Sequence, residues 1–189
     1  DSAPPDLIIN ASGVPKQTIP DTSVFIQKEL GYSGIPSFSI HSTCLSFLTA
    51  FHSASSLIEA NQYKKILIVS SDRGSIGRNF NEPESAALLG DGAAAVLVEL
   101  SDNNEESCLE YWKMKTYSSG ADLTEVRGGG TRLHPQDSKT IFSDNLFSMN
   151  GPQIYRLARK KIYKMLLEML RDQKIKTTDI NLVIPHQAS

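Results

Sequence analysis

The chain has 189 residues, of which 40% are hydrophobic and 21% are charged, and its formal net charge is −2. This composition is typical of a soluble globular protein. Lys and Arg form no block that would bind phosphates, so nucleic acid is not an expected partner. No apolar run approaches the ~20 residues that a membrane span needs. Residues 1–10 lack the basic and apolar regions of a signal peptide.

The sequence contains two cysteines, Cys44 and Cys108. They form neither a Cys-x-x-Cys pair nor a Cys/His cluster at the spacing of zinc ligands, so no metal is expected. The count alone allows one disulfide. The favoured interpretation is two free thiols in a reducing, cytoplasmic compartment.

Strands and helices are predicted to alternate along the chain. Short apolar or alternating runs predict strands over residues 6–10, 37–40, 65–70, 93–100, 109–117 and 179–185, the fourth and fifth forming a hairpin. Helical periodicity predicts helices that begin at Asp21 or Thr22, at Cys44 and at Gln153 and that end near residues 30, 60 and 173. Residues 120–150 have few periodic apolar positions and are expected to form a surface excursion or lid. The alternation predicts an α/β layered fold around a largely buried mixed sheet.

Two glycine-rich segments need interpretation. Gly90-Asp91-Gly92 precedes a predicted strand and does not open a helix after one, so it lacks the pattern of a nucleotide-binding loop. A tight turn with permissive backbone angles is the expected role. Gly128-Gly129-Gly130 indicates local flexibility and nothing more specific.

Cys44 is the strongest candidate nucleophile. It lies where the predicted strand 37–40 gives way to a helix. Free N–H groups and partial positive charge at a helix N-terminus favour a thiolate, and they can hold the oxyanion that forms when a thioester is attacked. Its neighbours Ser42, Thr43 and Ser46 are small and leave room for a substrate. A buried structural cysteine is the alternative.

His186 follows the last predicted strand, in Pro185-His186-Gln187-Ala188. Catalytic groups collect at the carboxyl ends of strands in α/β sheets, and an imidazole suits proton handling or hydrogen-bond donation near neutral pH. A surface or core histidine is the alternative. The remaining histidines, His41, His52 and His134, are interpreted as structural.

Four segments resemble, in order, the β-ketoacyl synthase III group of the thiolase-like superfamily. They are the strand and cysteine turn at 36–44, the strand at 65–72, the Gly-Asp-Gly segment at 89–95 and the histidine motif at 185–188. The resemblance implies a thiolase-like, five-layer αβαβα architecture, incomplete in this chain, and a homodimer.

The resemblance also implies an acyltransferase of fatty-acid or polyketide biosynthesis. Cys44 would accept an acyl group from acyl-CoA or acyl carrier protein, and a malonyl thioester would decarboxylate and attack that group. His186 would help to stabilise the enolate. No permanently bound cofactor is implied. Met149, Phe142 and Phe147 are candidates to line the substrate tunnel, and ordinary core packing explains them equally well.

The chain departs from the family pattern in two places. Leu45-Ser46 replaces a small Ala-Gly pair, and Ser189 stands where the family has Asn. By resemblance, residues 1–118 form most of the amino-terminal half, 119–150 an irregular connecting segment or lid, and 151–189 the beginning of the carboxyl-terminal half. The family's catalytic asparagine and glycine-rich oxyanion loop would lie beyond Ser189. A piece of a longer polypeptide, not competent for the full reaction alone, is therefore expected.

Other functions remain open. The same cysteine could pass its acyl group to an amine, a hydroxyl or a second acyl chain. The chain could be a non-catalytic scaffold subunit of a condensing-enzyme complex, although the presence of both Cys44 and His186 argues against it. An unrelated Cys–His hydrolase would need a base hydrogen-bonded to Cys44, and it leaves the Gly-Asp-Gly segment unexplained.

Overall fold

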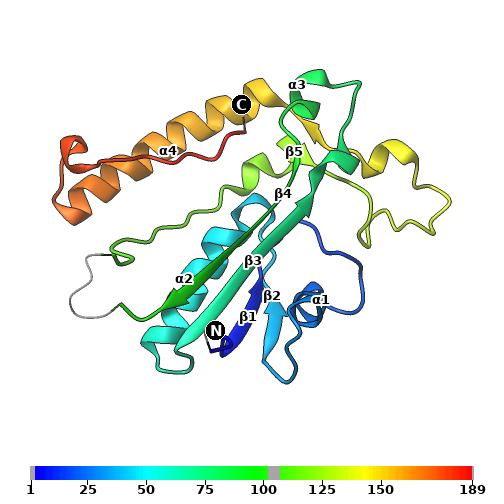
Figure 1. Ribbon diagram of the computed structural model, residues 1–189. Helices are drawn as coiled ribbons and strands as arrows, with labels where there is room; N and C mark the ends of the chain where they lie inside the picture. The colour runs from blue at the N-terminus through cyan, green and yellow to red at the C-terminus, as the bar shows by residue number, and fades with distance from the viewer. Residues whose placement is uncertain (1–2, 102–106, 189) are drawn as a thin grey trace. The chain divides into compact units, whose positions relative to one another are not determined.

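The computed structural model of the chain describes residues 3–101 and 107–188. Contacts divide it into two compact units (Figure 1). The first unit comprises Asp1–Arg73 and Asp91–Glu110, and the second comprises Gly74–Gly90 and Tyr111–Ser189. Each unit has its own sheet and its own helices.

The first unit is built on a four-stranded sheet with the order β2-β1-β3-β4. Its strands are β1 (Leu7–Asn10), β2 (Ser37–Ser39), β3 (Lys65–Arg73) and β4 (Asp91–Glu99). β1 runs parallel to both β2 and β3, whereas β4 is antiparallel to β3 along its whole length. The predicted mixed sheet is therefore present. The carboxyl ends of β1, β2 and β3 lie at one edge of it.

Helix α2 (Ser46–Glu59) supplies much of the core of this unit. Its buried face carries Ala50, Ala54 and Ile58, which cluster with alternate residues of β1 and with Ile66 and Ile68 of β3. The alanines recur every four residues, so one face of the helix can approach the sheet closely. All four residues of β1 are buried, as expected for a central strand that is covered on both faces.

Helix α1 (Thr22–Glu29) contacts β1 and β2. The Asp21 side chain caps it by accepting a hydrogen bond from the N–H of Ser23, which confirms the predicted start of the helix.

The second unit contains α3 (Pro83–Ala86), α4 (Gly151–Gln173) and a small sheet in which β5 (Thr124–Glu125) pairs with β6 (Ser148–Met149). Glu82 joins two segments of this unit. Its carboxylate accepts hydrogen bonds from the N–H of Met149 (3.1 Å) and from the hydroxyl of Ser148 (2.9 Å). These bonds, led by the one from Met149, hold the pKa of Glu82 below its usual value. The amphipathic helix predicted from Gln153 is confirmed as α4.

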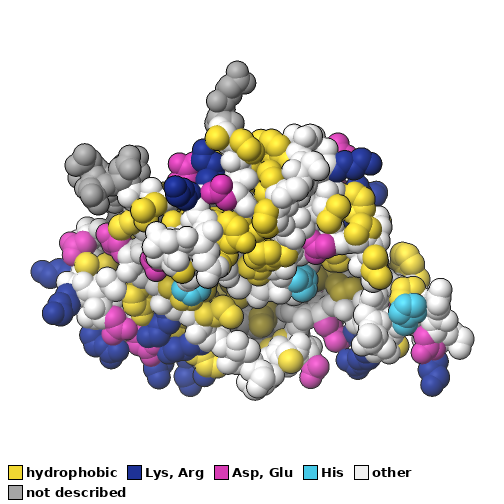
Figure 2. Space-filling model, turned by 90° about the horizontal axis from the view of Figure 1, so that it is seen from below, with side chains coloured by type: hydrophobic (Ala, Val, Ile, Leu, Met, Phe, Trp, Pro, Cys, Tyr) yellow, Lys and Arg dark blue, Asp and Glu magenta, His cyan; other side chains and the backbone are white. Residues whose placement is uncertain are grey.

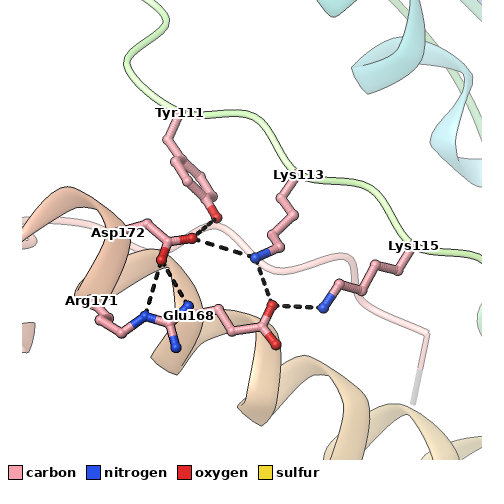
Figure 3. A network of polar contacts seen from close by, with 6 residues as sticks. All are labelled: Tyr111, Lys113, Lys115, Glu168, Arg171 and Asp172. Carbon is pink, nitrogen blue, oxygen red and sulfur yellow. Dashed lines mark hydrogen bonds and ion pairs between the residues drawn. The ribbon is translucent and has the colours of Figure 1, made fainter.

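The strand and hairpin predicted at 109–117 are wrong, because no strand forms there. Residues 111–117 instead run along α4 and are fastened to it by side chains (Figure 3). The hydroxyl of Tyr111 donates to Asp172 (3.2 Å), and the ammonium groups of Lys113 and Lys115 each lie 2.6 Å from Glu168. Alternate side chains therefore point to one surface, as in a strand, but the surface belongs to a helix and not to a neighbouring strand.

The charged groups of this cluster shift the pKa values of their partners. Hydrogen bonds from Lys113 and then Lys115 lower the pKa of Glu168 to about 2. The Glu168 carboxylate in turn raises the pKa of Lys113. The fastening of residues 111–117 to α4 is therefore electrostatic, and it depends on the ionised form of Glu168.

Two further predictions are wrong. Residues 180–188 follow a 3-10 helix (Thr177–Asp179) and form no strand, because no strand among the described residues pairs with them. Gly90-Asp91-Gly92 does not form a tight turn, since Asp91 and Gly92 pair with Arg73 and Asp72 at the start of β4. Neither Gly90 nor Gly92 has a positive φ.

Hydrophobic side chains reach the surface on the face shown in Figure 2. Of the three candidates for a substrate tunnel, Phe142 is 79% exposed, and Phe147 and Met149 are half-buried. None of the helices within the described ranges has the length and hydropathy required to cross a membrane.

Candidate active site

The carboxyl edge of the three parallel strands of the first unit positions the candidate nucleophile. Beyond the strand ends, the N–H of Ile40 donates to the carbonyl of Asn10 (2.9 Å), and the N–H of Ala11 donates to the carbonyl of Val69 (2.7 Å). The first bond joins the loop after β2 to β1, and the second joins the loop after β1 to β3. Ligands and reactive groups commonly lie at this edge of an α/β sheet.

Cys44 lies in a 3-10 helix (Thr43–Leu45) between β2 and α2, and the residue is exposed. The prediction that the α-helix begins at Cys44 is wrong by two residues, because α2 begins at Ser46. The N–H of Leu45 donates to the carbonyl of Ser42 (3.0 Å), which closes the tight turn around the cysteine. The turn thus precedes the α-helix and presents Cys44 at the surface of this unit.

Thr43, directly before the cysteine, has a φ of 49°. This left-handed conformation is rare for a β-branched residue, because Cβ then crowds the backbone, and it costs roughly 1–2 kcal/mol. Such conformations persist where the surroundings hold them, and they cluster at functional sites. Here the N–H and the hydroxyl of Ser46 both donate to the carbonyl of Thr43.

A chain of polar side chains lies beneath this edge. Asn10 donates to the hydroxyl of Ser39 (2.9 Å) and accepts from the hydroxyl of Ser12 (2.7 Å). Ser12 in turn accepts from the N–H of Ser71 (2.9 Å), and Ser39 donates to Asp21 (2.9 Å). Asn10 and Ser12 are almost fully buried. This chain of polar side chains therefore links the ends of β1, β2 and β3 to the start of α1, and it is largely shielded from water.

Asp21 ends this polar chain. Burial raises the pKa of its carboxyl group, but hydrogen bonds from the hydroxyls of Ser23 and Ser39 and from the N–H of Ser23 outweigh burial, so the pKa of Asp21 is lower than usual. The carboxylate form is therefore the one that suits the folded unit.

Asp72 braces the loop after β1. Its carboxylate accepts hydrogen bonds from the N–H groups of Gly13 (3.0 Å) and Val14 (2.9 Å). A Cβ added to Gly13 would lie 3.7 Å from the carbonyl of Thr43, so this loop also abuts the cysteine turn. The end of β3 thereby supports the turn through the loop after β1.

His186 belongs to the second unit, where it is exposed in the irregular segment that ends the described chain. Cys44 belongs to the first unit. His41 is exposed near the cysteine turn, and His52 is half-buried within α2. Nδ1 of His134 accepts a hydrogen bond from the N–H of Gln136 (3.2 Å) in the second unit.

A cavity of about 630 Å³ lies in the first unit, away from the cysteine turn. Phe51 and Ser55 of α2, Leu97 of β4 and the second thiol, Cys108, are among the residues that line it. Cys44 does not line it. Within residues 3–101 and 107–188, no group of three or more His, Cys, Asp or Glu side chains is arranged to hold a metal ion.

Sequence reasoning missed two residues that shape the cysteine turn. Ser46 was recognised only as a small neighbour and as a departure from a family pattern, and Asp72 only as the end of a strand motif. Their roles depend on bonds to backbone groups of distant or irregular segments. A residue pattern gives no signal of such bonds.

The chain is similar in sequence to known proteins. Residues 38–118, which include Cys44 and strands β3 and β4, match the family model described as 3-oxoacyl-[acyl-carrier-protein (ACP)] synthase III. The β-ketoacyl-[acyl-carrier-protein] synthase III of Rickettsia bellii (strain OSU 85-389) is 30% identical over 185 residues, which are 97% of this chain and 55% of that protein. The protein of the same name from Clostridium perfringens (strain SM101 / Type A) is 31% identical over 184 residues, covering 97% of this chain and 56% of that one.

A crystal structure of 3-oxoacyl-[acyl-carrier-protein] synthase III from Aquifex aeolicus VF5 matches with a TM-score of 0.80. The two chains are 26% identical, and the match covers 97% of this chain and 54% of the other. The chain therefore spans about half the length of the curated relatives that it matches. The similarity to these relatives extends beyond the family-model match.

Proposed function

From the premise that this chain is β-ketoacyl synthase III-like over 97% of its length, we propose that it is part of a condensing acyltransferase with Cys44 as its nucleophile. The observation that carries the proposal is the cysteine turn: a strained backbone, held from Ser46, presents an exposed thiol at the carboxyl edge of parallel strands. The predicted α/β, thiolase-like fold class is confirmed by the match to the Aquifex aeolicus structure.

In the first step the Cys44 thiolate attacks the carbonyl carbon of an acyl thioester. A carbon–sulfur bond to Cys44 forms, the bond to the carrier thiol breaks, and the carrier leaves as a thiolate that takes up a proton. The N–H of Cys44 itself is suited to stabilise the oxyanion, whereas the N–H groups of Ser42, Leu45 and Ser46 already donate within the turn. The acyl donor is acyl-CoA or an acyl carrier protein.

In the second step a malonyl thioester loses carbon dioxide. The resulting enolate attacks the acyl carbonyl, a carbon–carbon bond forms, and Cys44 is released as a thiolate. We assign to His186 the donation of a hydrogen bond to the enolate oxygen. On this proposal, residues 1–118 form most of one thiolase-like half, 119–150 connect the halves, and 151–189 begin the other half of a homodimer subunit. The two exposed free thiols suit a reducing, cytoplasmic compartment.

The test is the intact mass of the complete natural protein after brief incubation with acetyl-CoA, hexanoyl-CoA and decanoyl-CoA. A gain of one acyl group, lost in Cys44→Ala and kept in Cys108→Ala, supports the nucleophile. Subsequent addition of a malonyl thioester should discharge the acyl group as a β-ketoacyl product with release of carbon dioxide.

Other outcomes favour other functions. An acyl-enzyme that malonyl thioesters do not discharge would favour transfer to an amine, a hydroxyl or a second acyl chain. Absence of an acyl-enzyme with CoA donors and with acyl carrier protein thioesters would favour the scaffold subunit and would refute the proposal.

A further inference from the structure

One buried hydroxyl connects the residues before Cys44 to the start of α2. Ser46 is 1% exposed. Its Oγ donates to the carbonyl of Thr43 at 2.7 Å and accepts from the N–H of Ser42 at 2.9 Å. The donor and an acceptor position of the hydroxyl are both used, and both partners lie directly before the cysteine.

Other serines of α2 behave differently. The hydroxyls of Ser53, Ser55 and Ser56 each donate to the backbone carbonyl four residues earlier, within the same helix. This is the ordinary way in which a serine bonds inside a helix. Ser46 instead bonds outside the helix, to the turn, and it satisfies an N–H that the helix cannot reach.

The turn needs such support. Thr43 adopts a left-handed conformation that is unfavourable for a β-branched residue. Without the Ser46 hydroxyl, the N–H of Ser42 would lose that acceptor, and the carbonyl of Thr43 would lose one of its donors and keep the N–H of Ser46. The backbone on the amino-terminal side of Cys44 would then be free to relax.

We propose that Ser46 is the positioning residue of the nucleophile: its hydroxyl holds Thr43 in the left-handed conformation and so fixes where the Cys44 thiol meets an acyl thioester. The inference rests on the proposed function, because it concerns the acylation of Cys44.

The experiment compares single-turnover acylation of the complete protein and its variants by acetyl-CoA and hexanoyl-CoA, followed by rapid quenching and intact mass. In Ser46→Ala the maximal rate of acylation is expected to fall by roughly 10- to 100-fold, as for a reacting group displaced by about 1 Å. The donor concentration at half-maximal rate should not change. Ser46→Thr keeps the hydroxyl and should recover most of the rate.

Ser53→Ala is the matched control, because it removes a half-buried hydroxyl from the same helix but far from the turn. It should acylate at the wild-type rate. A fall in the amplitude of acylation in Ser46→Ala at an unchanged rate would mean a role in folding only, and it would overturn the inference. If Ser46→Ala does not fold, Ser46→Gly replaces it with the same expectation, and a wild-type rate in that variant would also overturn it.

The two proposals fail in different ways. If the wild-type protein acylates on Cys44 and Ser46→Ala acylates equally fast, the role of Ser46 is refuted and the nucleophile stands. If the wild-type protein takes no acyl group from any donor, the proposed function fails and the role of Ser46 fails with it.

Discussion

Replacing Asn10 by alanine should test whether the polar chain beneath the cysteine turn stabilises the first unit. Asn10 is 2% exposed and bonds to Ser39 and Ser12. Ser39 would keep Asp21 as an acceptor. The hydroxyl of Ser12, which is 3% exposed, would lose Asn10 as its acceptor, and an unsatisfied buried donor costs about 1–3 kcal/mol.

The void left by the amide adds about 1 kcal/mol. Asn10→Ala should therefore lower the free energy of unfolding by about 2–4 kcal/mol, a large share of the stability of an ordinary domain. With a urea m-value of about 2 kcal/mol/M, the midpoint of urea unfolding falls by about 1–2 M.

The assay is urea denaturation of the complete protein, followed by circular dichroism and compared with Gln62→Ala. Gln62 carries an exposed amide in the same unit, and its loss should change stability by less than about 0.5 kcal/mol. An Asn10→Ala variant that matches Gln62→Ala would refute the reasoning, since the buried network would then contribute nothing measurable.

Two further predictions concern the second unit. Glu168 has its pKa lowered from 4.5 to about 2 by the two lysines that contact it, so its stabilisation is complete above about pH 4.5 and is lost as the pH falls towards 2. The fluorescence of Trp112, the one tryptophan of the sequence, should therefore change between pH 7 and pH 3, and in Glu168→Gln it should already be changed at pH 7. Equal spectra of both proteins at pH 7 would contradict this. A Cβ on Gly74 would lie 2.7 Å from the carbonyl oxygen of Gly90, so Gly74→Ala should lower the free energy of unfolding by about 1–3 kcal/mol, as measured by thermal unfolding. Gly77→Ala is the control, because a Cβ there would have nothing within 4 Å and should not change stability. Equal melting temperatures of the two variants would show that the backbone at Gly74 moves aside at no energetic cost.

Elements defined by their own hydrophobic pattern were predictable from the sequence. The stripe along α4 and the apolar run of β3 depend on residues within a single segment, and both elements lie where they were predicted. The β3 strand extends three residues further than predicted, because its ladder with β4 continues to Arg73 and Asp91.

Elements that depend on a distant partner were not predictable in the same way. Residues 111–117 alternate as a strand would. A two-residue period, however, indicates only which side chains share a face and not what lies against that face. In the structure the face meets acidic residues of α4, and the backbone forms no ladder. Residues 180–185 have strand-like composition and no pairing strand among the described residues. Without a ladder, β propensity alone does not make a strand.

The prediction failed most informatively at the cysteine itself. Helical periodicity extends back to Cys44, yet α2 begins at Ser46. Cys44 and Leu45 belong to a tighter turn with Thr43, which is in a left-handed conformation. Natural sequences are locally consistent with their folds except where another requirement intervenes, and functional sites are the usual exceptions. A β-branched residue in an unfavourable conformation, held by a buried hydroxyl directly beside an exposed thiol, is such an exception. The mismatch between the local pattern and the backbone therefore supports the proposal that Cys44 is the nucleophile, on grounds other than the resemblance to known proteins.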